Sequence, residues 1–172
     1  MAASTDKTNK PLIPRGVDDR PVDKYNRAEL YSGKALDFDG VNDVVNIGAE
    51  GGTYNDFTLV CNLKTSYASD FQSIFSTGSV QDFYINPTGQ VRVFIGASYD
   101  TTNFPRVNSG EWVNFVFTRS GSTGSFYYNG VLVETLTIST TALNNTDVRI
   151  GTNQYGSYPF NGEMAGVKLF NT

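Results

Sequence analysis

The chain has 172 residues and a net charge of −4, with no histidine and a single cysteine. This length allows one domain with a hydrophobic core and an additional segment. Without histidine the protein has no histidine-based catalytic triad and no histidine-ligated zinc site, and one cysteine cannot form an internal disulfide. An acidic chain also lacks the basic surface of a general nucleic-acid-binding protein, so we expect no nucleic-acid partner.

Residues 1–33 are predicted to form an extended arm in front of a folded domain at 34–172. Pro11, Pro14 and Pro21 interrupt regular structure in the arm, and its few apolar residues are scattered among charges of both signs. The first residues lack the apolar segment of a secretion signal, and no run approaches the roughly 20 apolar residues of a membrane span. We therefore expect no membrane insertion, and a protein that is intracellular or released by lysis or within a particle.

The arm contains a short apolar clip, in which Leu12 and Ile13 lie between two prolines. Fixed proline torsions lower the entropy cost of ordering this clip on a partner. We expect Arg15, Arg20 and Arg27 to pair with acidic residues of the same partner. The alternative is a leader that binds nothing, which this composition also allows.

The folded domain opens with the stretch ALDFDGVNDVVNIG, from Ala35 to Gly48. Two short apolar runs flank a tight loop, which we interpret as the turn of a β-hairpin. Gly40 would supply an unusual backbone torsion, and the carboxylates of Asp39 and Asp43 would accept hydrogen bonds from backbone amides.

Three further segments alternate apolar and polar residues with the period of a β-strand. Asn86–Gly89 and Asn129–Gly130 have the composition of tight turns, and Ser120–Ser125 is interpreted as a flexible connection. No segment has a helical pattern, so we predict a two-sheet antiparallel sandwich in which Cys61 is a buried, inert thiol. The residues that alternation places together on one face of their strands are Phe57, Leu59, Cys61 and Leu63, then Val91, Val93 and Ile95, then Val113, Phe115 and Phe117.

Three motifs in this order resemble those of laminin-G-like, concanavalin A-like jelly-roll domains. They are the opening stretch, then EWVNFVFTRSGSTGSFYYNGVLVETLT, then VRIGTNQYGSYPFNGEMAGVKLFN. Together they span Ala35 to Asn171. The resemblance implies an all-β jelly-roll sandwich and makes Trp112 the tryptophan of the family's central strand, hence a core residue. It implies no single function, because the fold occurs in lectins, glucanases, adhesion modules and virion proteins.

The sequence does not predict an enzyme. Glycoside hydrolysis uses a pair of carboxylates, which the similar glucanases place two or three positions apart on one strand. Here Glu111, Glu134 and Glu163 are isolated in the sequence. No cofactor is expected, except that calcium is an option, with Asp39 and Asp43 as its candidate ligands. Other oxygen donors for calcium are Asn42, Asp82, Asp100 and Asn103, and all of these residues are equally suited to turns.

Two loops rich in aromatic and amide side chains are candidates for carbohydrate binding, Tyr99–Arg106 and Thr152–Pro159. Exposed aromatic rings stack on sugar faces, while amide groups bind hydroxyls. The alternative is that these loops pack against neighbouring loops or subunits. The candidate carbohydrate-binding residues are Tyr99, Asn103, Asn153, Tyr155 and Tyr158.

Two functional hypotheses follow. The first is a non-enzymatic virion protein that decorates or cements a viral capsid or tail, because laminin-G-like domains recur in tailed-phage particles. The arm would then bind a capsid or other virion protein, and the domain could touch cell-surface glycans. The alternative is a carbohydrate-binding module or adhesin-type lectin domain, extracellular or at the cell surface. A homo-oligomer is expected in both cases, since sandwich edges and aromatic loops offer subunit contacts.

Overall fold

The computed structural model describes residues 35–49, 52–67, 69–78 and 81–172. The predicted arm therefore lies outside the described residues, and its boundary with the domain at residues 33 and 34 remains a prediction. The same holds for the predicted partner-binding residues Leu12, Ile13, Arg15, Arg20 and Arg27.

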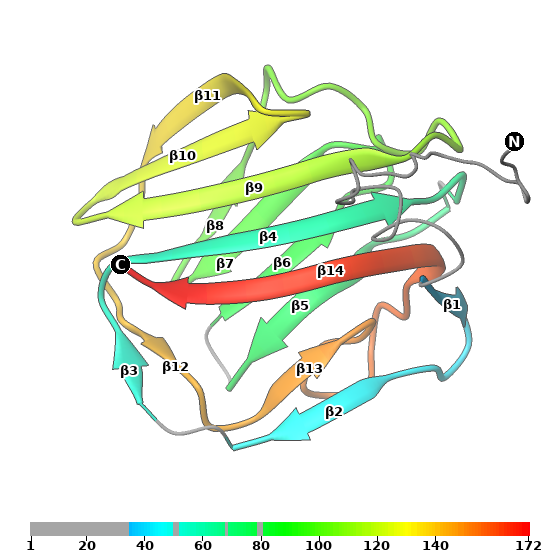
Figure 1. The fold of residues 1–172 in the computed structure, drawn as a ribbon, viewed down its shortest axis with the longest axis horizontal. Coiled ribbons are helices and arrows are strands. Elements are labelled where there is room, and N and C mark those ends of the chain that lie inside the picture. Colours follow the sequence, from blue (N-terminus) through cyan, green and yellow to red (C-terminus); the bar gives the residue numbers. More distant parts are fainter. Residues whose placement is uncertain (1–34, 50–51, 68, 79–80) are drawn as a thin grey trace, which may run out of the picture. The chain divides into compact units, whose positions relative to one another are not determined.

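The described residues form strands and no helix, so no helix among them has the length and apolar character needed to cross a membrane. The first sheet contains, in spatial order, β1 (Leu36–Asp39), β14 (Asn161–Asn171), β4 (Phe57–Lys64), β9 (Val113–Ser120), β10 (Thr123–Tyr128) and β11 (Val131–Thr137). The second contains β2 (Val45–Gly48), β13 (Val148–Ile150), β5 (Gln72–Thr77), β6 (Gln81–Ile85), β7 (Val91–Ile95) and β8 (Ser98–Asp100). A short pair joins β3 (Thr53–Tyr54) to β12 (Leu143–Asn144). Figure 1 shows the two large sheets as separate layers, which confirms the predicted antiparallel sandwich.

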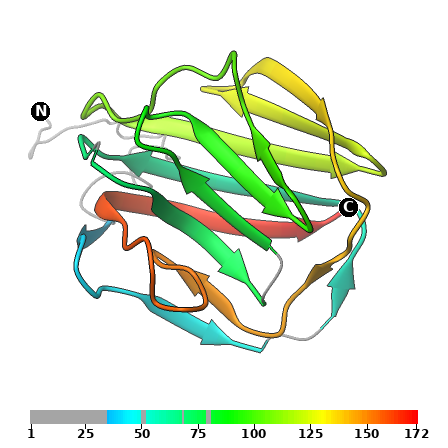
Figure 2. The same ribbon diagram turned by 180° about the vertical axis from the view of Figure 1, so that it is seen from behind.

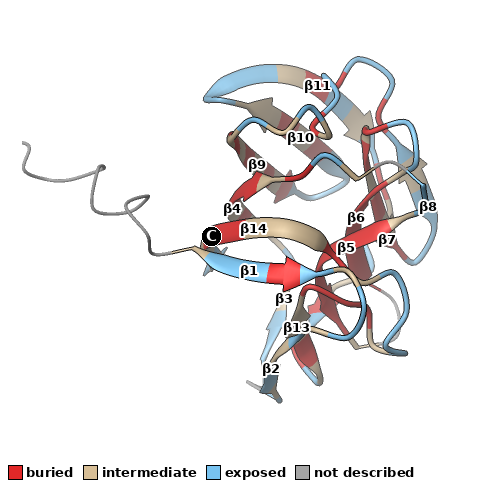
Figure 3. Ribbon diagram, turned by 90° about the vertical axis from the view of Figure 1, so that its right-hand side faces the viewer, coloured by how far each residue is buried: buried red, intermediate tan, exposed pale blue. Residues whose placement is uncertain are grey.

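The hydrophobic core fills the space between the two sheets, where the buried segments gather in Figure 3. Every residue that alternation places together on one face of these strands is buried there. The Phe83 ring of the second sheet lies 6.3 Å from Phe57 and 5.2 Å from Phe117 of the first sheet, measured between centroids. Cys61 is fully buried, and this burial raises the pKa of its thiol, which keeps the group protonated and inert as predicted.

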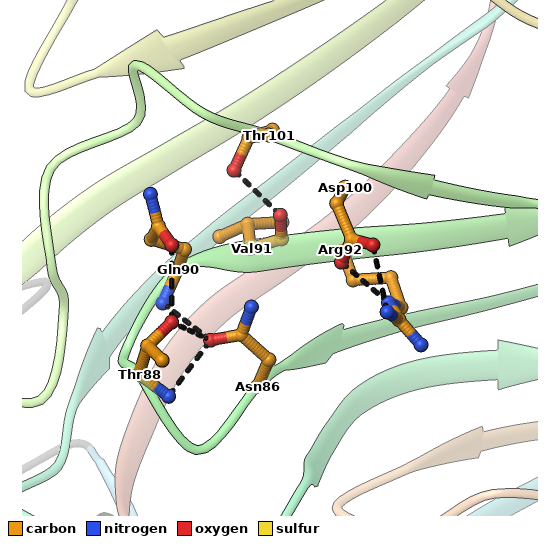
Figure 4. A network of polar contacts seen from close by, with 7 residues as sticks. All are labelled: Asn86, Thr88, Gln90, Val91, Arg92, Asp100 and Thr101. Atoms are coloured by element: carbon orange, nitrogen blue, oxygen red, sulfur yellow. Dashed lines mark hydrogen bonds and ion pairs between the residues drawn. The ribbon is translucent and has the colours of Figure 1, made fainter.

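Two predicted turns are confirmed by their backbone geometry. Asn129 and Gly130 have φ values of 50° and 85°, which is the conformation of a two-residue hairpin turn between β10 and β11. Between β6 and β7, the Asn86 side chain accepts hydrogen bonds from the backbone amides of Thr88 and Gln90 at 2.9 and 3.0 Å (Figure 4). The expected flexible connection at Ser120–Ser125 was wrong, because β10 follows β9 after two residues and pairs with it directly.

The loop at Asp39–Asp43 is not a hairpin turn, contrary to the prediction. β1 belongs to the first sheet and β2 to the second, so this loop carries the chain across the sandwich. Its local chemistry is as predicted: Gly40 has φ 79°, and the carboxylate of Asp43 accepts the Asp39 amide at 2.9 Å. The Asn161 side chain, at the start of β14, donates to the carbonyl of Asp39 at 2.9 Å and ties the crossing to the first sheet.

Trp112 is not a core residue, so that expectation was also wrong. It lies one residue before β9 and is half-buried. Strand residues alternate between the two faces of a sheet, and Val113 and Phe115 already occupy the inward positions. The residue before Val113 therefore points to the opposite face of the first sheet.

Candidate functional site

The candidate site lies on the face of the second sheet that points away from the core. Phe83 and Val93 are buried in the core, so the alternating residues Asp82 and Phe94 face outward. Ser76 on β5 pairs with Asp82 on β6, and Asp82 pairs with Phe94 on β7. Three neighbouring strands thus place a hydroxyl, a carboxylate and an aromatic ring in one row.

A compact loop follows β13 and lies against this face (Figure 2). The Asn153 side chain organises the loop, because its Oδ1 atom accepts hydrogen bonds from the amides of Tyr155 at 3.0 Å and Ser157 at 2.8 Å. Two hydrogen bonds fix the loop to β5. The Ser76 hydroxyl donates to the backbone carbonyl of Thr152 at 3.1 Å, and the Ser73 amide donates to the backbone carbonyl of Tyr158 at 2.8 Å. The loop is therefore held in place by the strand beneath it.

An open cavity of about 240 Å³ lies between the loop and the strands. Its aromatic lining consists of Tyr84 and Phe94 from the sheet and Tyr155 and Tyr158 from the loop. Tyr155 is 77% exposed, which leaves its ring available to a ligand. Polar lining comes from Ser76, Gln81, Asp82, Asn153 and Gln154.

The aromatic side of the cavity is part of a cluster of packed rings. The Tyr158 ring lies 5.4 Å from Phe71 and 5.9 Å from Tyr84, and Phe71 lies 5.4 Å from Tyr84. The guanidinium carbon of Arg92 lies over the Phe71 ring, 5.2 Å from its centroid. Figure 4 shows that Arg92 is bound by both carboxylate oxygens of Asp100, at 2.6 and 2.7 Å.

Asp82 is the electrostatically unusual residue of the site. It is 9% exposed, and burial raises the pKa of its carboxyl to about 7, although hydrogen bonds from the Ser73 hydroxyl and the Phe83 amide partly oppose this rise. The Ser73 hydroxyl donates to Oδ1 at 2.6 Å. Near neutral pH this carboxyl is therefore divided between its charged and neutral forms. The charged form accepts a hydrogen bond from a ligand hydroxyl, and the neutral form can also donate one.

Three of the five residues predicted to bind carbohydrate, Asn153, Tyr155 and Tyr158, line this cavity. The sequence reasoning named Asp82 only as a calcium donor and did not include Tyr84 or Phe94 among the site residues. The alternation of residues in QDFYI, with Phe83 and Ile85 inward, was the signal that places Asp82 and Tyr84 together on the outer face.

Tyr99 and Asn103 do not line the cavity. The Tyr99 hydroxyl accepts a hydrogen bond from the Ser139 amide at 2.8 Å. The loop after it is anchored in the fold, because Phe104 is buried and the carboxylate of Glu134 accepts the amide of Asn103 at 2.6 Å. This loop therefore corresponds to the alternative in which an aromatic loop packs against its neighbours.

Calcium binding at Asp39 and Asp43 is not confirmed. Within the described ranges, no three His, Cys, Asp or Glu side chains are grouped so that they could hold a metal ion. Both carboxylates accept backbone amides of their own loop, at 2.8 Å from Val41 to Asp39 and at 2.9 Å from Asp39 to Asp43. Calcium takes six to eight oxygen ligands, more than these two side chains supply.

A search of curated proteins finds no match to this chain. Solved structures do share its fold. A Bacteroides ovatus protein to which carbohydrate binding has been ascribed aligns with a TM-score of 0.63 and 20% identity, over 80% of this chain and 44% of that one. Domain 4 of AbnA, a GH43 extracellular arabinanase of Geobacillus stearothermophilus in complex with arabinotriose, aligns with a TM-score of 0.61 and 16% identity, over 74% of this chain and 66% of that one.

The CBM40 of Ruminococcus gnavus IT-sialidase, bound to α2,3-sialyllactose, aligns with a TM-score of 0.56 and 16% identity, over 80% of this chain and 91% of that one. At these identities the likeness concerns the fold alone. The chain spans less than two thirds of the Bacteroides protein and of the arabinanase domain. A family model described as the concanavalin A-like lectin/glucanases superfamily matches residues 39–172, so the chain belongs to that laminin-G-like family, as its three motifs predicted.

Proposed function

We propose that this protein is a non-catalytic carbohydrate-binding domain that holds a saccharide in the cavity beside Tyr155. The observation that carries the proposal is the combination of an exposed aromatic ring with a buried carboxylate and an anchored amide around one cavity. Apolar walls with a few well-placed polar groups are typical of small-molecule sites. Two proteins of the same fold are in complex with arabinotriose and with sialyllactose, which supports this class of ligand.

Three side chains of the cavity have groups that can still bind a sugar: the ring of Tyr155, the Nδ2 group of Asn153 and the carboxylate of Asp82. Tyr155 offers its ring face to the apolar face of a sugar. Because the Oδ1 atom of Asn153 accepts two loop amides, its Nδ2 group is the donor that this side chain offers to a sugar oxygen. The Asp82 carboxylate has lone pairs beyond those that Ser73 and Phe83 use, and it accepts sugar hydroxyls.

Binding is favoured over hydrolysis by the number of carboxylates. Glycoside hydrolysis typically uses two carboxyl groups about 5 to 9.5 Å apart on either side of the glycosidic bond. Among the described residues that line the cavity, Asp82 is the one carboxylate. The partners proposed for the protein are accordingly glycans, with an extracellular or cell-surface location.

The experiment that tests this function compares the full-length protein with Tyr155→Ala on a glycan array and by calorimetry with the best ligand. Phe170→Ala is the matched control, because Phe170 is 48% exposed on β14 and does not line the cavity. We expect about tenfold weaker binding for Tyr155→Ala, from the loss of one stacked ring, and unchanged binding for the control. Absence of saccharide binding by the full-length protein, or equal affinity of both variants, would contradict the proposal.

The virion role remains a prediction from the sequence. The residues that would anchor the protein to a capsid are outside the described part of the chain, and the comparisons support the carbohydrate-binding alternative more than a virion role. The predicted homo-oligomer is likewise untested.

A further inference from the structure

On the basis of this proposed function, we infer that the cavity selects electrically neutral saccharide residues and rejects residues that carry a carboxylate, such as sialic and uronic acids. The inference rests on the charges around the cavity, on the environment of Asp82 and on the size of the space. It specifies the class of ligand for the site described above.

The cavity offers no cation to an acidic sugar. Neither lysine nor arginine is among the described residues that line it. Arg92 lies on the same outer face of β7 as Phe94 and pairs with Tyr84, but both oxygens of Asp100 bind its guanidinium, at 2.6 and 2.7 Å. A carboxylate ligand is normally recognised by a guanidinium or ammonium group that is free to pair with it.

Asp82 also repels an acidic ligand. The groups that face it are hydroxyls of β5, the Phe94 ring of β7, the aromatic Tyr84 of its own strand, and the amide and tyrosine side chains of the loop. None of these is a cation. Two arginines on the same outer face are each paired with an aspartate: Arg92, opposite Tyr84, with Asp100, and Arg149, opposite Ser76, with Asp147. Burial also strengthens electrostatic interactions, because the local dielectric constant is lower than that of water. A second carboxylate in the cavity would therefore meet an uncompensated like charge, whereas hydroxyls would meet an acceptor.

The volume of the cavity matches a single sugar residue. About 240 Å³ corresponds to roughly eight water molecules of liquid volume, which is the scale of one monosaccharide ring. The charge of the residue inside the cavity is therefore decisive, and charged residues elsewhere on a glycan extend into solvent. Sulfated or acidic glycans that present a neutral terminal residue remain ligands.

The test uses matched pairs of probes that differ at one carbon atom: glucose- and galactose-terminated oligosaccharides beside their glucuronic and galacturonic acid counterparts. For the full-length protein at pH 8.5, we expect the neutral member to bind on the order of tenfold more tightly or better. Asp82→Asn preserves the size of the side chain and the Oδ1 acceptor, and it should bring this ratio close to one. Asp37→Asn removes the same charge from an exposed position outside the cavity and should leave the ratio unchanged.

A second readout is pH. At pH 5 the preference for the neutral member should weaken in the full-length protein, because Asp82 is then protonated, while Asp82→Asn should show no such change. Equal binding of neutral and acidic members at pH 8.5, or an unchanged ratio in folded Asp82→Asn, overturns the inference and leaves the proposed function standing. If no probe binds at all, both are overturned.

Discussion

Asp82→Asn should change how the stability of the protein depends on pH. Burial raises the pKa of Asp82 from 3.8 to about 7. Between these values the folded state binds a proton that the unfolded state has lost, so the free energy of unfolding falls as pH rises. The difference of about three pKa units corresponds to about 4 kcal/mol, at about 1.4 kcal/mol per unit. This contribution is fully present below pH 3.8 and is lost as pH rises through about 7.

The assay is urea denaturation of both proteins at pH 4 and at pH 8, with the free energy of unfolding extrapolated to water. At pH 4 the two proteins should have similar stability, because Asp82 is protonated when folded. At pH 8 the variant should be the more stable by up to about 4 kcal/mol, since an amide carries no charge to desolvate. Asp37→Asn should follow the parent protein at both pH values. If Asp82→Asn also follows the parent protein, the buried carboxyl is not the source of the pH dependence and the reasoning is refuted.

Three further changes test the fold. Glu134→Ala leaves two loop amides without an acceptor and should lower the free energy of unfolding, measured by urea denaturation, by about 2 kcal/mol. Glu134→Gln should recover part of this loss. Unchanged stability of Glu134→Ala would contradict the role of the carboxylate. Phe117→Ala should lower the free energy of unfolding by about 3 to 5 kcal/mol and Trp112→Ala by clearly less, because of these two residues the phenylalanine is the fully buried one. A larger loss of stability for Trp112→Ala would contradict this ranking. Gly151→Ala should lower the melting temperature by about 4 °C or more, since Gly151 has φ 91° and a Cβ atom there would overlap the Phe38 ring. An unchanged melting temperature would show that the loop accommodates the side chain.

The strands were predictable because their residues alternate. The inward residues of β4 and β9 follow from period two alone, and the Asn129–Gly130 turn follows from the torsions that these two residues tolerate. The loop at Asp39–Asp43 shows where local information ends. Its hydrogen bonds are those of a tight turn, but the strands on either side pair with β14 and β13, more than 90 residues further along the chain. No pattern within the loop encodes which sheet each strand joins.

The candidate site was predictable only on its loop side. Tyr155 and Tyr158 stand out in the sequence because they lie among glycine, serine and asparagine, where an aromatic ring has no core to fill. Phe94 and Tyr84 lie in strands, where an aromatic residue is ordinary and its face depends on the register. The pairing of β6 with β7 is local, but the place of these two rings in the cavity also requires the loop after β13, which is more than 55 residues further along the chain.

A comparison of two buried carboxylates shows why the cavity is the candidate site. Glu134 and Asp82 are 8% and 9% exposed, so both are largely removed from water. Glu134 accepts the amides of a loop that it holds in place, which gives its burial a structural reason. Asp82 has a raised pKa, hence a net cost to the folded state at neutral pH, and it faces a cavity with an exposed ring. A perturbed carboxyl that faces a cavity is typical of a group that a ligand uses. The pH dependence of stability and the preference for neutral sugars are therefore two consequences of one carboxyl group.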